Sequence, residues 1–349
     1  MPGIMLRYGE YLPLTAATPL LSLREGSTPL QPAPRLARWI GVTELFLKVE
    51  GLNPTGSFKD RGMVVAVARA LEDGARAVLC ASTGNTAASA AAYAAHAGIE
   101  AIVLLPEGKV AAGKLAQAVT YGARVVTVSG NFDDALDLAR DAAAQYDVAL
   151  VNSVNPFRIE GQTTGAYEIC DELGDAPELL ALPVGNGGNI SAYWLGFQRA
   201  VDHGRSQRLP RMLGVQALGA APLVLGHPVS QPETVATAIR IGNPATWQPA
   251  VDAADHSGGE IRAVSDDAIL EAYHAIARME GVFCEPASAA GVAGLRAAVR
   301  AGVIAADTSC VCVLTGNGLK DPDTAIRAGT HGLHVEPDLS RLASALGWS

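Results

Sequence analysis

Lys59 is the residue of this sequence whose type and surroundings best suit covalent chemistry. It stands in NPTGSFKDRG (residues 53–62), where Pro54 and Gly56 predict a tight turn directly before a helix. The partial positive charge at a helix N-terminus disfavours a second cation, so we expect the pKa of Lys59 to be lowered. An amine that loses its proton near neutral pH can attack a carbonyl carbon. The alternative is an ordinary solvated surface lysine.

Three further polar turns each follow an apolar, strand-like run. ASTGNT (81–86) would present hydroxyl and backbone N–H groups to an anion such as a carboxylate, or would only cap a helix. GNGGN (185–189) predicts a backbone cradle for a phosphate, with a plain glycine turn as the alternative. It is not the dinucleotide-binding fingerprint, because Ile190 stands where glycine is needed. TGNG (315–318) offers a hydroxyl that suits a neutral ring nitrogen, or forms only a turn.

These four segments together predict one ligand. It carries a phosphate, a carbonyl that condenses with a lysine, and a ring nitrogen. Pyridoxal 5'-phosphate has all three, so we expect it as the cofactor. The seven histidines are dispersed and form no metal-binding spacing, so no metal is predicted.

Short apolar runs alternate with longer amphipathic runs, which is typical of strands and helices around parallel sheets. The expected strands are 45–49, 77–81, 101–105, 124–128, 149–151, 179–184, 212–217 and 310–314. The expected helices are 60–72, 85–97, 111–121, 131–145, 161–172, 190–201, 266–279 and 287–301. The Gly- and Pro-rich segments 219–232 and 242–259 are expected to be loops.

This layout predicts an α/β fold with two three-layer αβα domains and mostly parallel sheets. Residues 1–52 and 151–349 are expected to form a large cofactor-binding domain, and residues 53–150 a smaller inserted domain. Such sheets bind ligands beyond the carboxyl ends of their strands, so we expect the cofactor in the cleft between the domains.

The composition excludes several classes of protein. Of the 349 residues, 49% are hydrophobic and only 17% charged, with 37 glycines, so we expect a closely packed core of small side chains. The mean hydropathy of +0.20 argues against disorder, and the net charge of −9 argues against nucleic acid or an anionic membrane as partner. No membrane span or signal peptide is apparent. Five scattered cysteines predict reduced thiols in a cytoplasmic protein.

The order of the motifs resembles that of a known enzyme family. SFKD, STGNT, GNGGN and TGNGLKD follow one another as in pyridoxal-phosphate enzymes of fold type II, whose fold is tryptophan synthase beta-like. Within that group the sequence resembles the threonine synthases, over nearly the whole length from Arg7 to Asp321.

The resemblance implies a role for each matched residue. Lys59 would bind the cofactor covalently and then act as the catalytic base at Cα. Asn85 would contact the cofactor's phenolic oxygen, and Thr315 would contact its pyridine nitrogen. The cofactor phosphate would be held by Gly185, Asn186, Gly187, Gly188 and Asn189. The substrate carboxylate and neighbouring groups would be held by Ser82, Thr83 and Thr86, and the substrate phosphate by Asn152, Ser153 and Arg158. Thr163 departs from the family, in which lysine is frequent there, but has no assigned role.

The resemblance also implies a reaction. O-phospho-L-homoserine and water would give L-threonine and phosphate by a β,γ-elimination and replacement in a homodimer. A serine/threonine dehydratase of the same fold is the main alternative, and it needs no phosphate site for its substrate. A relative acting on another phosphorylated or sulfonated amino acid also stays open, as does a non-catalytic binding protein, although the intact Lys59 favours an enzyme.

Overall fold

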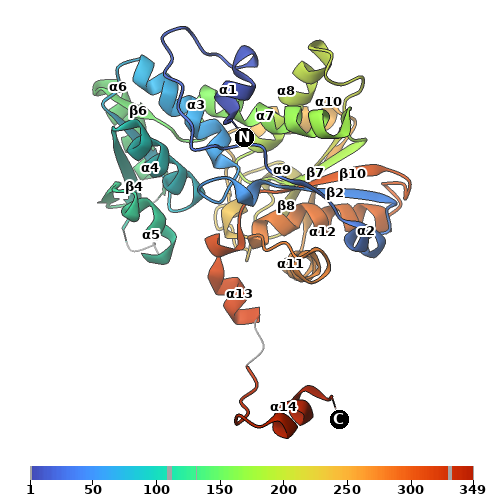
Figure 1. Cartoon of the computed structure of the whole chain (residues 1–349). Coiled ribbons are helices and arrows are strands. Elements are labelled where there is room, and N and C mark those ends of the chain that lie inside the picture. The colour runs from blue at the N-terminus through green and yellow to red at the C-terminus, as the bar shows by residue number, and fades with distance from the viewer. Residues whose placement is uncertain (1, 108–111, 131, 329–331, 349) are drawn as a thin grey trace.

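The computed structural model describes residues 2–107, 112–130, 132–328 and 332–348. Within them, two sheets are flanked by helices (Figure 1). The larger sheet contains β1 (Leu30–Pro32), β2 (Glu44–Val49), β7 (Leu179–Pro183), β8 (Arg211–Ala217), β9 (Glu260–Val264) and β10 (Ser309–Leu314). Its strand order is β1-β2-β10-β7-β8-β9, and every neighbouring pair is parallel except β1 with β2.

The smaller sheet is parallel throughout. It contains β3 (Ala77–Ala81), β4 (Glu100–Pro106), β5 (Arg124–Val128) and β6 (Val148–Leu150) in the order β5-β4-β3-β6. The predicted α/β class with mostly parallel sheets is thereby confirmed. The domain boundaries after residues 52 and 150 stay a prediction, although the strands of the smaller sheet all lie between these two positions.

Helices flank the two sheets or extend beyond them. They are α1 (Ile4–Arg7), α2 (Pro34–Ile40), α3 (Lys59–Glu72), α4 (Asn85–Ala97), α5 (Ala112–Thr120), α6 (Phe132–Gln145), α7 (Pro156–Leu173), α8 (Gly188–Asp202), α9 (Pro222–Leu225), α10 (Trp247–His256), α11 (Asp266–Glu280), α12 (Pro286–Arg300), α13 (Pro322–Ala328) and α14 (Leu339–Leu346). Short 3₁₀ turns are η1 (Gly9–Tyr11), η2 (Glu50–Leu52), η3 (Thr237–Ile239) and η4 (Gly318–Lys320). Residues 111 and 131, where two expected helices begin, lie outside the described residues.

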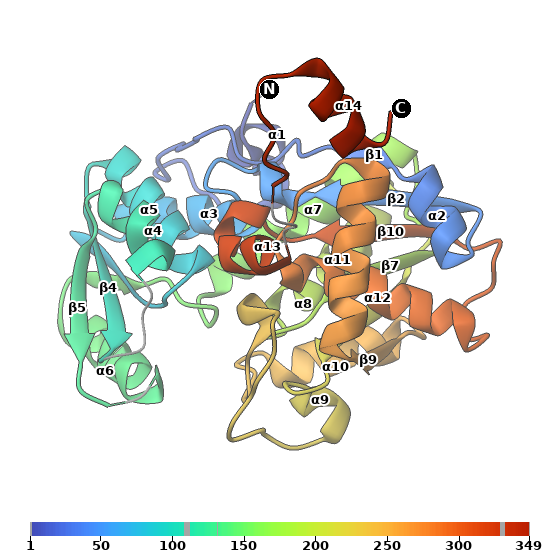
Figure 2. The same ribbon diagram turned by 90° about the horizontal axis from the view of Figure 1, so that it is seen from below.

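The larger sheet is the middle of three layers. Along β10, Cys310 and Cys312 join the core under α2, α11 and α12, whereas Val311 and Val313 join the core under α7 and α8. Figure 2 shows α11 and α12 across one face of this sheet. This alternation follows from the strand period of two and explains why β10 is apolar on both faces.

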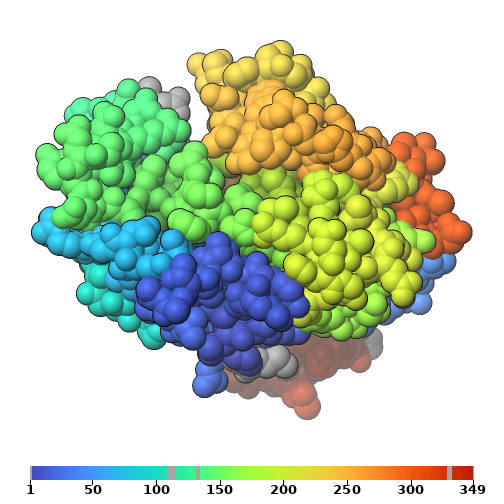
Figure 3. Space-filling view, turned by 90° about the horizontal axis from the view of Figure 1, so that it is seen from above, coloured from blue at the N-terminus to red at the C-terminus, as the bar shows by residue number. Residues whose placement is uncertain are grey.

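One core cluster runs from one sheet to the other. It includes Val78 and Val103 of the smaller sheet together with Leu180 and Val311 of the larger one. In the space-filling view the green surface of the smaller-sheet segment and the yellow-to-orange surface around α10 stand on either side of a notch (Figure 3). The helices α13 and α14 extend away from both sheets (Figure 1). The described residues include no helix with the length and hydropathy of a membrane span.

The loop prediction for residues 242–259 is wrong, because α10 lies within it. Its apolar face is formed by alanines, of which Ala250, Ala253 and Ala254 are buried. Because glycines and prolines flank this short helix, its helical periodicity was not recognised in the sequence. The helix predicted from residue 161 begins at Pro156 instead, where Asn155 Oδ1 accepts a hydrogen bond from Phe157 N (3.0 Å).

Two glycines bring α3 and α7 into backbone contact. A Cβ at Gly62 would lie 2.4 Å from the carbonyl oxygen of Arg158, and a Cβ at Gly161 would lie 2.1 Å from that of Arg61. Because no side chain fits between them, the first turns of the two helices lie directly against each other. This contact is the close packing that the glycine-rich composition predicts, and it brings Lys59 and Arg158 to one place.

Buried ion pairs fix the same two helices. Arg61 of α3 donates from Nε to Glu50 (2.7 Å) and from Nη2 to Glu168 of α7 (2.6 Å). All three side chains are buried. Lys48 of β2 is a second buried partner of Glu168, at 2.9 Å. Removing one member would leave an uncompensated buried charge, so this network specifies how α3 and α7 pack.

Candidate active site

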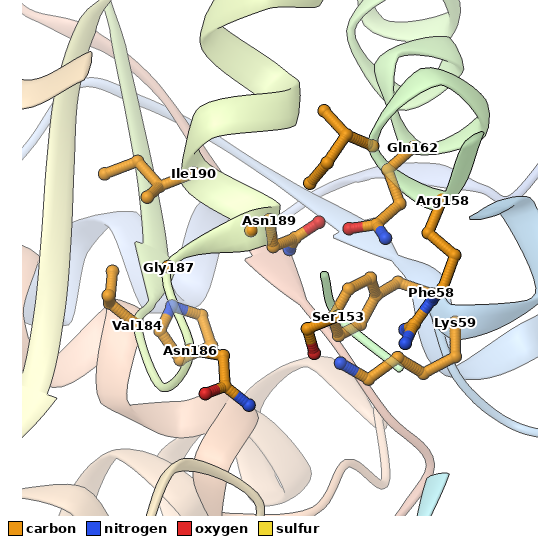
Figure 4. Close-up of a pocket in the computed structure, with 13 residues that line it drawn as sticks. Phe58, Lys59, Ser153, Arg158, Gln162, Val184, Asn186, Gly187, Asn189 and Ile190 are labelled. Carbon is orange, nitrogen blue, oxygen red and sulfur yellow. The ribbon is translucent and has the colours of Figure 1, made fainter. Parts of the chain in front are cut away.

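Lys59 is the first residue of α3 and is held against the end of β10. Phe58 N donates to the carbonyl oxygen of Thr315 (3.0 Å), and Asn317 N donates to that of Gly56 (2.9 Å). The lysine turn and the TGNG turn are therefore hydrogen-bonded to each other, although they are far apart in the sequence. Figure 4 shows the amino group of Lys59 pointing toward the space near Ser153.

The pKa of Lys59 is lowered from 10.5 to about 7. Burial is the largest cause, the Arg158 guanidinium lowers the pKa further, and the Glu285 carboxylate opposes both. The sequence predicted the direction from the helix N-terminus, and the structure adds burial as the main cause. The amino group also lies 4.2 Å from the ring centroid of Phe58. Near neutral pH a large fraction of Lys59 is therefore an uncharged nucleophile.

A small cavity lies in front of Lys59. Its walls come from the lysine turn, the start of α7 and the loop from β7 to α8. The lining residues are Phe58, Lys59, Ser153, Arg158, Ile159, Gln162, Pro183, Val184, Asn186, Gly187, Gly188, Asn189 and Ile190. The structure thus brings together these predicted site residues: Lys59, Ser153, Arg158, Asn186, Gly187, Gly188 and Asn189.

The GNGGN loop forms the wall where α8 begins. Gly187 has φ +86°, and a Cβ there would lie 2.5 Å from the carbonyl oxygen of Thr246, so glycine is required. Asn186 O accepts a hydrogen bond from Thr246 N (2.9 Å), which ties the loop to the segment before α10. Gly185 does not line the cavity. A Cβ placed on Gly185 would lie 3.2 Å from Ile239 Cα. A helix N-terminus that opens on a cavity suits an anion.

Several buried polar atoms around this cavity have no hydrogen-bond partner among the described residues. They are both amide atoms of Asn189, Oε1 of Gln162 and Nε of Arg158. An unpaired polar atom in the interior costs free energy comparable to a lost hydrogen bond, so a polar ligand would restore these bonds. Together with the glycine loop, these unpaired atoms fit the phosphate of the expected cofactor.

Arg158 is the most informative of these residues. Its side chain is 1% exposed, and among the described residues its Nη1 donates to the carbonyl oxygen of Val151 (3.1 Å). No ion pair within the described residues includes it, and burial lowers the pKa of its guanidinium to about 10. A buried cation without a carboxylate is unfavourable, so Arg158 is neither a solvated surface charge nor half of a salt bridge. It is suited to an anionic ligand.

The ASTGNT turn lies outside the lining of this cavity. Asn152 holds it in place, because its Oδ1 accepts from Ala81 N (2.9 Å) and its Nδ2 donates to Ala81 O (2.8 Å). Ser82 Oγ accepts a hydrogen bond from Gly84 N (3.3 Å), and Thr86 is buried. The N-cap residue of α4 is Gly84, which has no side chain to cap it, so the alternative of a plain helix cap is not adopted. Thr83 belongs to the same half-buried turn.

Asn85 and Thr315 lie near Lys59 but outside the lining. Asn85 Nδ2 donates to the carboxylate of Glu285, at 3.3 and 3.2 Å from its two oxygens. Thr315 Oγ1 lies 3.1 Å from Ser288 Oγ, so its hydroxyl is oriented by a second hydroxyl. Sequence reasoning missed Glu285 and Ser288. Both lie at the start of α12, an alanine-rich helix whose sequence carries no signal of a site.

Comparisons with known proteins show which family the chain is similar to. The family described as "Pyridoxal-phosphate dependent enzyme" matches residues 21–316. A threonine synthase of Mycobacterium tuberculosis is 60% identical over 327 residues, which are 93% of this chain and 91% of that relative. A threonine synthase of Synechocystis is 55% identical over 349 residues, 99% of this chain and 91% of the relative. Among solved structures, maize serine racemase superposes with a TM-score of 0.74 over 86% of this chain and 91% of its own, at 23% identity, which shows a shared fold.

Proposed function

The chain belongs to the threonine synthases among the pyridoxal-phosphate-dependent enzymes of fold type II, and we propose that the cavity in front of Lys59 is its active site. It is a pyridoxal-phosphate-dependent lyase that converts O-phospho-L-homoserine and water to L-threonine and phosphate. The roles of single residues in this reaction are our proposals.

Three groups of residues would hold the cofactor. Lys59, uncharged in part at neutral pH, would bind its carbonyl carbon covalently. The cofactor phosphate would lie at the GNGGN loop from Gly185 to Asn189, which supplies backbone N–H groups and the unpaired amide of Asn189. Asn85 would donate to the phenolic oxygen, and Thr315 would face the pyridine nitrogen as a neutral partner. When bound there, pyridoxal phosphate supplies an electron sink for negative charge that develops on the substrate.

Ser153 and Arg158 would bind the substrate's own phosphate. The single observation that carries this proposal is the buried Arg158 guanidinium, which has no carboxylate partner among the described residues and lines the same cavity as Lys59. A guanidinium donates two parallel hydrogen bonds to a phosphate, so it can hold the leaving group in one orientation. Asn152 would support the same site by holding the ASTGNT turn, and its second amide N–H would donate to the phosphate.

Lys59 would also move protons during the reaction. With a pKa of about 7 it can accept a proton from Cα and, after releasing that proton, accept one from Cβ without a large free-energy cost. Ser82, Thr83 and Thr86 would bind the substrate carboxylate through hydroxyl and backbone N–H groups, which places Cα near Lys59. We place the site in the cleft between the two proposed domains, and we propose a homodimer that works in the cytoplasm, where the five free, buried cysteines would stay reduced.

Product analysis tests the reaction. Phosphate release and threonine formation from O-phosphohomoserine are measured beside 2-oxobutyrate formation from threonine. We expect the first reaction to dominate. If 2-oxobutyrate were the only product formed, the dehydratase alternative would replace the proposal.

A further inference from the structure

Glu285 has a buried carboxyl group that contacts distant parts of the chain. It precedes Pro286 at the start of α12 and is 4% exposed. Its side chain forms no hydrogen bond that caps the helix. The carboxylate accepts from Asn85 Nδ2 instead, at 3.3 Å to Oε1 and 3.2 Å to Oε2. Asn85 begins α4 beside the smaller sheet, so this contact joins two distant parts of the chain.

The carboxyl group cannot move far from this contact. Glu285 N donates to the carbonyl oxygen of Gly316 (2.9 Å), and a Cβ at Gly316 would lie 2.4 Å from Oε1 of Glu285. The glutamate side chain is therefore packed against the backbone of the TGNG turn. Because Phe58 is hydrogen-bonded to Thr315 of this turn, Glu285 is fixed relative to the segment that carries Lys59.

Charged groups on several elements face Glu285. Burial raises the pKa of Glu285 above its usual value. The hydrogen bond from Asn85 and the charges of Lys320 of η4 and Lys59 of α3 oppose this shift, and Asp321 adds to it. Lys320 Nζ also donates to Gln117 Oε1 of α5 (2.5 Å). A carboxylate accepts hydrogen bonds and cannot donate them, so it turns the NH₂ group of Asn85 toward itself.

We propose that Glu285 is a positioning residue that fixes the amide of Asn85, holding one N–H of Nδ2 and leaving the second N–H for the cofactor's phenolic oxygen. A carboxamide has two N–H donors on the same nitrogen, which makes this double use geometrically natural. Without the carboxylate the amide can rotate and present its oxygen, which repels a phenolic oxygen. The inference rests on the proposed function, because that proposal assigns Asn85 to the cofactor.

A double-mutant cycle on the dissociation constant of pyridoxal phosphate tests the proposal. The cofactor is titrated into the apoprotein of four chains: the unmodified protein, Glu285→Ala, Asn85→Ala and the double variant. We expect each single substitution to weaken binding about tenfold, the order for one hydrogen bond to a charged group. The double variant should bind no more weakly than Asn85→Ala alone. Losses that multiply to about a hundredfold would mean that Glu285 acts independently of Asn85, and would overturn the proposal.

A conservative variant keeps the test decisive if Glu285→Ala does not fold. Glu285→Gln retains an acceptor for Asn85, so its dissociation constant should stay within about threefold of the unmodified protein. A loss of tenfold or more in this variant would contradict the proposal. The matched control is Glu280→Gln, because the Glu280 carboxylate accepts from Leu36 N (2.6 Å) at the start of α2, and binding of the cofactor should not change.

These measurements use no substrate. A protein that binds pyridoxal phosphate but forms no threonine would contradict the proposed reaction and leave the cycle decisive. A protein that binds no pyridoxal phosphate would instead overturn the proposed site, and with it the role of Glu285.

Discussion

Substituting Gly187 by alanine tests whether the GNGGN loop has the one backbone shape that the site needs. The residue has φ +86°, a conformation that costs an L-residue about 1–2 kcal/mol. The new Cβ would also lie 2.5 Å from the carbonyl oxygen of Thr246 and 2.9 Å from Ala250 Cβ. Both neighbours must shift, and over-packing of this kind costs about 1–3 kcal/mol more. The total expected loss in the free energy of unfolding is therefore about 2–5 kcal/mol.

Gly122→Ala is the matched control. Gly122 has φ +85°, nearly the same backbone strain, but no described atom lies within 4 Å of its notional Cβ. This control should lose only the backbone part, about 1–2 kcal/mol. Urea unfolding of both variants measures the difference, and titration with pyridoxal phosphate measures the loop itself. Gly187→Ala should weaken cofactor binding and Gly122→Ala should not. Equal losses of stability together with equal cofactor affinities would refute the reasoning.

Further outcomes follow from the same site. Arg158→Ala should raise KM for O-phosphohomoserine about 10–100-fold, because a charge-assisted hydrogen bond to the substrate phosphate is lost, and should leave the dissociation constant of the cofactor nearly unchanged. The control Arg199→Ala removes a half-buried partner of Glu160 and should leave KM unchanged in the same steady-state assay. Lys59 of the apoprotein should react with an uncharged acylating reagent at a rate, measured by peptide mapping, that is half-maximal near pH 7 and levels off at higher pH, because the amine is uncharged above its pKa of about 7. A rate that keeps rising toward pH 10 would contradict this prediction. Gly161→Ala should separate α7 from α3 and lower both the midpoint of thermal unfolding and kcat, since its Cβ would lie 2.1 Å from Arg61 O; a variant that unfolds and turns over like the unmodified protein would argue against the backbone contact.

Much of the fold could be predicted from the sequence, because the periods of its elements are regular. The helix expected over 85–97 has those bounds in the structure, and the predicted strand 77–81 does as well. Strand β9 and helix α10 were not predicted. The strand has a partly exposed pattern without clear alternation, and the helix is short, contains Pro249 and lies in a segment rich in glycine and proline.

The sequence predicts candidate site residues whose type and position in a turn suggest chemistry. It does not predict residues that only the folded chain brings near the site. Glycines and a lysine in a turn carry their chemistry in the sequence, whereas Arg158 was expected only from the family resemblance. Lys59, Gly187 and Arg158 line one cavity. Glu285 carries no such mark, because nothing about a glutamate before a proline at the start of a helix points to a ligand site. Only the packing of α12 against the TGNG turn brings its carboxylate to Asn85. The large part that burial plays in the pKa of Lys59 likewise depends on the assembled fold.

The attachment site of the cofactor tests the central claim most directly. The protein is loaded with pyridoxal phosphate, reduced with borohydride, digested and analysed by mass spectrometry, with Lys59→Ala and Lys320→Ala treated in parallel. We predict one modified peptide, labelled at Lys59, that is absent from Lys59→Ala and present in Lys320→Ala. A label on another lysine, or a label that persists in Lys59→Ala, would contradict the account.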